Sequence, residues 1–166
     1  MQSIPDSSHD GFTLLETVVA TGVLVTALAG IAQLFAASVR STREAGVQST
    51  ALVAAQVKLE MLRAFAFTYG PAGEPITDNA LSSSRGLTLA ENTPGFVDFL
   101  DHEGKAVEVG GDAPAAAFTR RWRIVPIDHF TPEALAIEVC VYRWPADGLT
   151  PSAADVCLAT VRTRQP

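Results

Sequence analysis

The stretch GFTLLE at residues 11–16 opens an apolar run that carries no charged side chain from Thr17 to Val39. Counted from residue 12, the run exceeds the about 20 residues that a helix needs to cross a bilayer. Glu16 lies at the amino-terminal end of this run, and an ionised side chain at the bilayer centre costs roughly 2.5 to 3.5 kcal/mol. We therefore predict a membrane-spanning helix over residues 12–39, in which Glu16 meets either water or a partner.

Small residues give this predicted helix faces on which neighbouring helices can approach closely. They are Gly22, Ala27, Ala29, Gly30 and Ala36. The alternative interpretation is a simple membrane anchor, because glycine is frequent in membrane helices whatever their function. Composition alone leaves both interpretations open.

The helical pattern continues beyond the membrane segment. Apolar side chains recur at alternating spacings of three and four residues, at Leu52, Ala55, Leu59, Leu62 and Ala66. Strong helix formers fill the gaps between them. The sequence Tyr69-Gly70-Pro71 should stop the helix, because glycine releases a helix end and proline cannot continue one. We predict one helix from residue 12 to about residue 67, with the apolar stripe buried against the carboxy-terminal sheet.

The rest of the chain predicts a small antiparallel sheet, so the fold class is α+β. Residues 70–94 are rich in Gly, Pro, Ser, Thr and Asn and are expected to connect helix and sheet, with at most a short element at 87–90. Apolar alternation and flanking turn residues predict the strands. The expected strands are 96–100, 105–109, 118–127, 135–144 and 156–163.

Two cysteines, Cys140 and Cys157, fall on the last two predicted strands and are separated by a turn-rich stretch. This spacing favours a cross-strand disulfide, which in an exported domain would stabilise the fold by roughly 3 kcal/mol in the chain-entropy model. Two buried thiols are the alternative, because a sequence gives no distance between the two residues. Two cysteines without a nearby histidine do not make a zinc spacing, so no metal site is predicted.

Length and charge narrow the classes of function. The 166 residues fit one modest domain and one long helix. A formal net charge of −6 gives no support for a nucleic-acid partner. The local basic cluster of Arg120, Arg121 and Arg123 lies on a predicted strand, and we interpret it as a solvated strand face.

Candidate catalytic residues are sparse. The histidines His9, His102 and His129 are scattered, and the adjacent pair Asp128-His129 lacks a third member, so we interpret it as a solvated loop. Calcium could bind turn acids, although such residues are usually just solvated. These acids are Asp101, Glu103, Asp147 and Asp155. We expect no enzymatic activity and no cofactor.

GFTLLE followed by an apolar helix resembles the class III signal of type IV pilins and pseudopilins. The resemblance covers Gly11 to about Phe67 and, more loosely, the layout of a small sheet domain after a long helix. It implies that a prepilin peptidase cuts after Gly11 and methylates the new amino terminus at Phe12. It also implies that this amine pairs with Glu16 of a neighbouring subunit during assembly. Two opposite charges at roughly 4 Å attract by about 4 kcal/mol at an effective dielectric of 20, before desolvation is subtracted.

The resemblance implies four segments: a leader at 1–11, a transmembrane and assembly helix at 12–39, the periplasmic half of the same helix at 40–69, and a sheet domain at 70–166 packed on 45–67. The chain would then be a minor pilin or minor pseudopilin, a structural subunit that primes or tips a type IV pilus or a type II secretion pseudopilus. Implied partners are the prepilin peptidase, other pilin or pseudopilin subunits and the inner-membrane assembly platform. The alternative function is a membrane-anchored periplasmic binding domain that does not polymerise.

Two features depart from the pattern of that family. The segment before Gly11 has two aspartates and no basic residue, whereas pilin leaders are usually basic. The first basic residues, Arg40 and Arg43, follow the apolar run, which by the positive-inside rule favours the opposite orientation. From the resemblance and the cysteines we predict a single-pass inner-membrane protein whose carboxy-terminal domain is periplasmic or extracellular.

Overall fold

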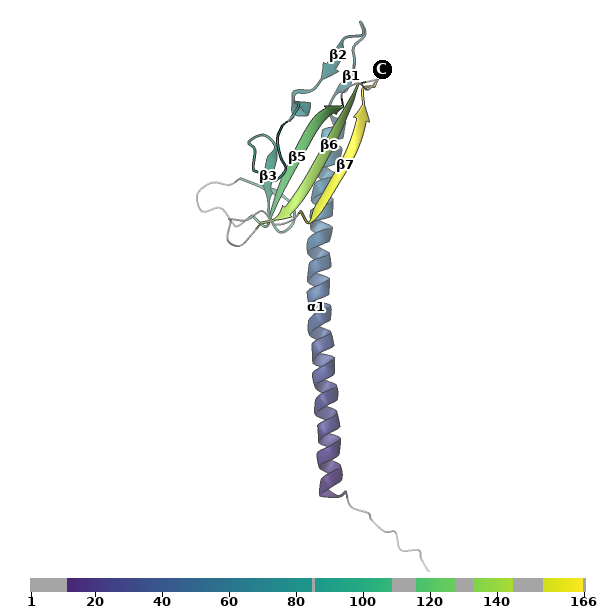
Figure 1. Ribbon diagram of the computed structural model, residues 1–166, viewed down its shortest axis with the longest axis vertical. Coiled ribbons are helices and arrows are strands. Elements are labelled where there is room, and N and C mark those ends of the chain that lie inside the picture. Colours follow the sequence, from purple (N-terminus) through teal and green to yellow (C-terminus); the bar gives the residue numbers. More distant parts are fainter. Residues whose placement is uncertain (1–11, 85, 109–115, 128–132, 145–153, 166) are drawn as a thin grey trace, which may run out of the picture. The chain divides into compact units, whose positions relative to one another are not determined.

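A computed structural model describes residues 12–84, 86–108, 116–127, 133–144 and 154–165 (Figure 1). The chain divides into two compact units, residues 1–44 and 45–166. The first unit contains the beginning of helix α1, which spans Leu14–Ala64. The second contains the end of α1 and all the strands that the structure describes.

Helix α1 ends three residues earlier than the sequence predicts, because the chain turns into a small hairpin. Strand β1, Phe67–Tyr69, pairs antiparallel with strand β2, Pro75–Thr77. A short 3₁₀ helix, η1, follows at Asn79–Leu81. The expectation that 70–94 is only a connection is therefore wrong at its beginning, and the short element expected at 87–90 is neither helix nor strand.

The other strands form one antiparallel sheet in the order β4-β3-β5-β6-β7. Their bounds are Val97–Leu100 (β3), Ala106–Val107 (β4), Phe118–Ile127 (β5), Ala134–Arg143 (β6) and Val156–Thr163 (β7). Figure 1 shows β5, β6 and β7 running side by side, with the register pairing Ile124 with Ile137 and Cys140 with Cys157. The predicted hairpin, the three long strands and the α+β class are confirmed.

One face of the sheet packs against the last turns of α1, and this face will be called the helix side. The buried helix residues are Ala51, Ala54, Ala55, Lys58, Leu59 and Leu62. The predicted stripe is thus correct at its centre but wrong at its ends, where Leu52 and Ala66 are exposed. The small side chains of Ala51 and Ala54 let the helix approach the sheet closely, so the buried face is rotated around the helix axis relative to the predicted stripe.

The strands contribute the other half of the core. Apolar side chains of β5 and β6 alternate toward the helix side, as the sequence predicts, and are buried there. They are Phe118, Trp122, Ile124, Leu135, Ile137, Val139 and Val141. Burying a side chain of this kind stabilises a fold by roughly 1.5 to 3 kcal/mol. This burial holds the end of α1 on the sheet.

The basic cluster on β5 is not a solvated face, so that prediction is wrong. Arg120 and Arg121 are buried, and only Arg123 is partly exposed. On the side of the sheet opposite the helix, Arg121 donates to the carbonyls of Leu89 and Ala90 and lies over the ring of Tyr142. The stretch after η1 therefore covers this arginine.

Candidate functional site

The beginning of α1 carries the sequence features that point to function. Every described side chain from residue 12 to residue 44 is exposed, including Leu14 at 84% and Phe35 at 71%. A helix that is apolar on all sides needs lipid or protein around it. Among the described residues, α1 is the one helix that is long and apolar enough to cross a membrane, by length and composition. Its charge-free part spans about 34 Å at 1.5 Å per residue, against roughly 30 Å of bilayer hydrocarbon.

Threonine hydroxyls inside this segment bond to the helix itself. Thr17, Thr21 and Thr26 each donate to the carbonyl four residues earlier, over 3.0, 2.6 and 3.1 Å. In hydrocarbon every polar group must find a partner within the protein, and these hydroxyls already have one. The three threonines are therefore compatible with a lipid environment.

Gln33 differs from the threonines, and the sequence interpretation missed it. Its side chain is exposed and has no hydrogen-bond partner among the described residues. A glutamine in a membrane helix can hydrogen-bond across to a neighbouring helix. An amide in an otherwise apolar run was the signal that could have found it.

The amino-terminal end of α1 has a capping arrangement that was also missed. Thr13 precedes the first helical residue, and the backbone N–H of Glu16 donates to its Oγ1 over 3.3 Å. Threonine followed three residues later by glutamate is the capping-box pattern, and a carboxylate in the first turn interacts favourably with the helix dipole. Glu16 thus has a role within its own helix, and it has no ion-pair partner among the described residues.

The predicted processing site is only partly described. Phe12 is 82% exposed at the amino-terminal end of the described chain, whereas Gly11 lies outside the described residues. The roles assigned to Gly11, Phe12 and Glu16 stay predictions.

The cysteine prediction is confirmed. Cys140 and Cys157 face each other across β6 and β7, with a Cα–Cα distance of 4.1 Å, and form a disulfide. The alternative of two free thiols is therefore excluded. Disulfides persist in oxidising compartments, so the bond indicates an extracytoplasmic domain.

Two of the acidic turn residues have structural partners. Asp101 accepts hydrogen bonds from the backbone N–H groups of Glu103 and Lys105, and Asp155 accepts one from the N–H of Arg143. The described part of the chain contains no group of three or more side chains that could hold a metal ion. His102 is exposed in the β3–β4 turn. His9, Asp128, His129 and Asp147 lie outside the described residues.

A buried group of charges joins α1 to the sheet. Asp98 on β3 accepts from Lys58 Nζ over 3.1 Å and from Arg120 Nη2 over 2.6 Å. Arg120 Nη1 also donates to the carbonyl of Ala54 over 2.9 Å, and Lys58 Nζ lies 3.5 Å from the ring centroid of Trp122. Burial lowers the pKa of Lys58, while Asp98 acts in the opposite direction. All charged members have partners, so we interpret this group as structural.

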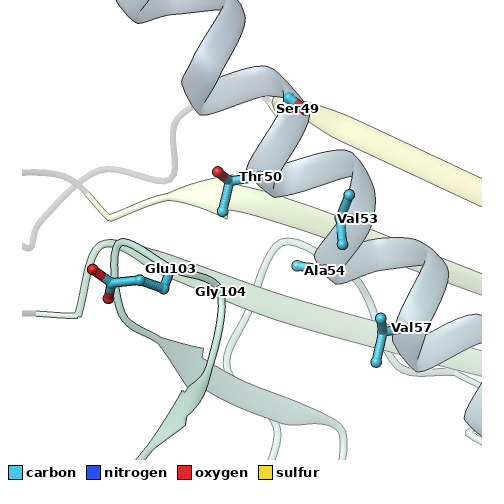
Figure 2. Close-up of a pocket in the computed structure, with 7 residues that line it drawn as sticks. All are labelled: Ser49, Thr50, Val53, Ala54, Val57, Glu103 and Gly104. Carbon is cyan, nitrogen blue, oxygen red and sulfur yellow. The ribbon is translucent and has the colours of Figure 1, made fainter.

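A hollow of about 330 Å³ lies between α1 and the β3–β4 turn. Figure 2 shows the turn approaching the helix at Thr50 and Ala54, with the carboxylate of Glu103 directed away from it. Valines 53 and 57 make most of the helix side of this hollow apolar. It lacks the convergent polar groups that would orient a ligand.

Comparisons of this chain with models of protein families, with curated proteins and with solved structures found no match. The functional interpretation rests on two features, an uncovered apolar helix that can cross a membrane and a disulfide-bonded antiparallel sheet.

Proposed function

We propose that this chain is a minor structural subunit of a type IV pilus or a type II secretion pseudopilus, and that it primes or tips the fibre without enzymatic activity. The observation that carries the proposal is the apolar beginning of α1, which is exposed on all sides and has Glu16 in its first turn. The GFTLLE stretch at residues 11–16 gives this helix its resemblance to pilin-like subunits.

The proposed assembly exchanges lipid for protein around the helix. Before assembly the apolar side chains lie in the bilayer, and in the fibre they pack against the helices of other subunits. Gln33 would then find a hydrogen-bond partner, and Glu16 would pair with the methylated amine of Phe12 on a neighbour. The prepilin peptidase and the inner-membrane assembly platform are the further partners that this function requires.

The first experiment is the intact mass of the protein recovered from its native membrane. We expect the loss of residues 1–11 and the addition of one methyl group at Phe12. A full-length, unmodified chain would contradict the proposal. The Gly11→Leu variant is the matched control, since a side chain at the cleavage position should block processing.

A second experiment separates the two roles of Glu16. Glu16→Gln removes the charge but keeps a residue that suits the capping box, whereas Thr13→Val removes the cap and keeps the charge. We expect both variants to be processed and inserted, with Glu16→Gln entering fibres poorly and Thr13→Val entering them normally. The opposite pattern would assign Glu16 to helix capping alone.

The second candidate function is a membrane-anchored binding domain that does not polymerise. The place of the Glu16 carboxylate in the first turn of α1 favours it, because a negative charge there stabilises a single helix through the helix dipole. Such a protein would retain residues 1–11, occur as single copies and tolerate the loss of the Glu16 charge. The intact mass and the Glu16→Gln variant therefore distinguish the two candidates.

A further inference from the structure

Strand β7 forms one edge of the five-stranded sheet. Just beyond it, the N–H of Arg164 donates toward β6, to Glu133, while the N–H of Gln165 donates away from β6, to Phe67 on β1. Because backbone groups alternate in direction along a strand, the N–H and C=O groups of the odd-numbered residues of β7 point away from β6. The short Cα–Cα distance of 4.1 Å at Cys157 fits this phase, since facing residues come closest where they exchange no hydrogen bonds.

The outward backbone groups of β7 are open. Cys157, Ala159, Val161 and Thr163 have exposed side chains, and their outward N–H and C=O groups have no partner among the described residues. Proteins usually protect such an edge with charged side chains, proline, a bulge or a very short strand. Strand β7 is eight residues long, contains no proline, and carries Arg162 as its single charged residue. Its edge is therefore suited to pair with another strand.

Arg162, the one charged residue of β7, has no anionic partner among the described residues. Its Nη1 is buried without a hydrogen-bond partner, whereas Arg164 beside it is paired with Glu133. Burial, and then the charge of Arg63, lower the pKa of Arg162. The aromatic ring of Phe67 lies 5.8 Å away and offers only a weak contact. A carboxylate beside Arg162 would neutralise its charge.

We propose that the open edge of β7 binds an extended strand of another protein, and that a carboxylate on that strand pairs with Arg162. The main chain of the incoming strand would bond to the outward groups of residues 157–163, as in β-strand addition. Its aspartate or glutamate would lie on the helix side next to Arg162. The residue before or after that acid would lie on the opposite face and pack against Val161, which favours a β-branched or aromatic side chain.

The occupant is not a second β7 strand. The sequence of β7, VCLATVRT, contains no acidic residue, so a twofold pairing of two β7 edges would bring two arginines and no carboxylate. The proposal is independent of fibre assembly, because it concerns the sheet alone.

Hydrogen–deuterium exchange on the full-length protein in detergent micelles tests the proposal. The probes are two blocked peptides of alternating threonine and valine, identical except for one central glutamate or glutamine. In the free protein, the amides of Ala159 and Val161 should exchange much faster than those of Leu158 and Thr160. The glutamate peptide should slow the outward amides at least tenfold and bind about fivefold more tightly than the glutamine peptide.

Two variants locate the effect. Ala159→Pro removes an outward N–H that the pairing with β6 does not use, so the fold should survive while peptide binding is lost. Ala159→Thr keeps the N–H and serves as its control. Arg162→Gln should retain binding and abolish the difference between the two peptides, which still tests the proposal if Ala159→Pro does not fold.

Four results would overturn the proposal. They are slow exchange of the outward amides in the free protein, no protection by either peptide, equal affinity of wild type for both peptides, and protection that grows with protein concentration alone. The last result would identify a second copy of this chain as the occupant.

Discussion

Gly104 in the β3–β4 turn has two constraints that other residues meet poorly. Its φ is +81°, and a Cβ atom there would lie 3.3 Å from Cγ2 of Thr50 on α1. We expect Gly104→Ala to lower the free energy of unfolding by about 1 to 2 kcal/mol, because an L side chain is strained at positive φ. Urea unfolding followed by tryptophan fluorescence measures the change.

The matched control for this prediction is Gly73→Ala. Gly73 has a similar φ of +82°, but no described atom lies within 4 Å of a Cβ placed there. Equal losses in the two variants would show that backbone strain is the whole effect. A larger loss at Gly104 would isolate the contact with the helix.

Lys58 should give the domain an alkaline pH dependence. Burial lowers its pKa in the folded state below the ordinary value of 10.5. Between these two values the unfolded chain holds more protons than the folded one, so the free energy of unfolding rises with pH. Lys58→Met should lack this rise, as urea titrations from pH 8 to 10.5 can measure.

Tyr142, whose pKa burial raises, contributes the opposite slope in both proteins, so its effect cancels in their difference. Parallel curves of unfolding free energy against pH for the two proteins would contradict the prediction.

For single residues, the sequence predicts those contacts whose two partners lie on neighbouring elements along the chain. The pairing of Cys140 with Cys157 follows from two adjacent strands and the turn between them. The burial of Lys58 and Arg120 does not, because each depends on Asp98, and other elements separate its strand β3 from α1 and from β5 along the chain. The same limit hides the unsatisfied nitrogen of Arg162.

Asp98 is the residue through which strand β3 connects α1 and β5. Removing its charge would leave Lys58 and Arg120 buried without an anion. We expect Asp98→Asn to destabilise the domain by about 3 kcal/mol, since breaking a buried ion pair on one side leaves an uncompensated charge. Chemical denaturation measures the loss.

The control variant for Asp98→Asn is Glu60→Gln. The ion pair of Glu60 with Arg63 lies on the surface of α1, where both side chains are at least half exposed. Its removal should cost no more than about 0.5 kcal/mol. Similar losses for the two variants would show that burial of the Asp98 group contributes little.

Among the elements, length decides how well the sequence predicts the structure. The long strands β5, β6 and β7 carry enough alternation to be predicted within a residue or two. Strands β1 and β2 have three residues each, too few for a pattern, and Arg164 fixes them from a distance by donating to the carbonyls of Thr68 and Ile76. The phase of the α1 stripe was shifted because the buried positions Ala51 and Ala54 are hard to distinguish from helix-forming alanines at the surface.

For the whole molecule, the disulfide and the basic residues after the apolar run give opposite indications of orientation. Arg40 and Arg43 favour the cytoplasm for the side that follows the run, whereas the Cys140–Cys157 bond favours export. We expect protease added to spheroplasts to digest the sheet domain, and thiol reagents to label the cysteines only after reduction. A protected domain with freely labelled thiols would place it in the cytoplasm.

The hydrogen bonds of Arg164 and Gln165 also determine when the domain can fold. Gln165 bonds to Phe67 and Tyr69, and Arg164 bonds to Thr68, almost one hundred positions earlier in the chain. If the sheet domain is exported during synthesis, the apolar face of α1 at residues 51–62 crosses the membrane long before β5, β6 and β7 arrive to cover it. Contacts of such long range form slowly, and exposed apolar surface invites aggregation in the interval. Export of this protein should therefore depend on a chaperone that shields residues 51–62 until the last strand has arrived.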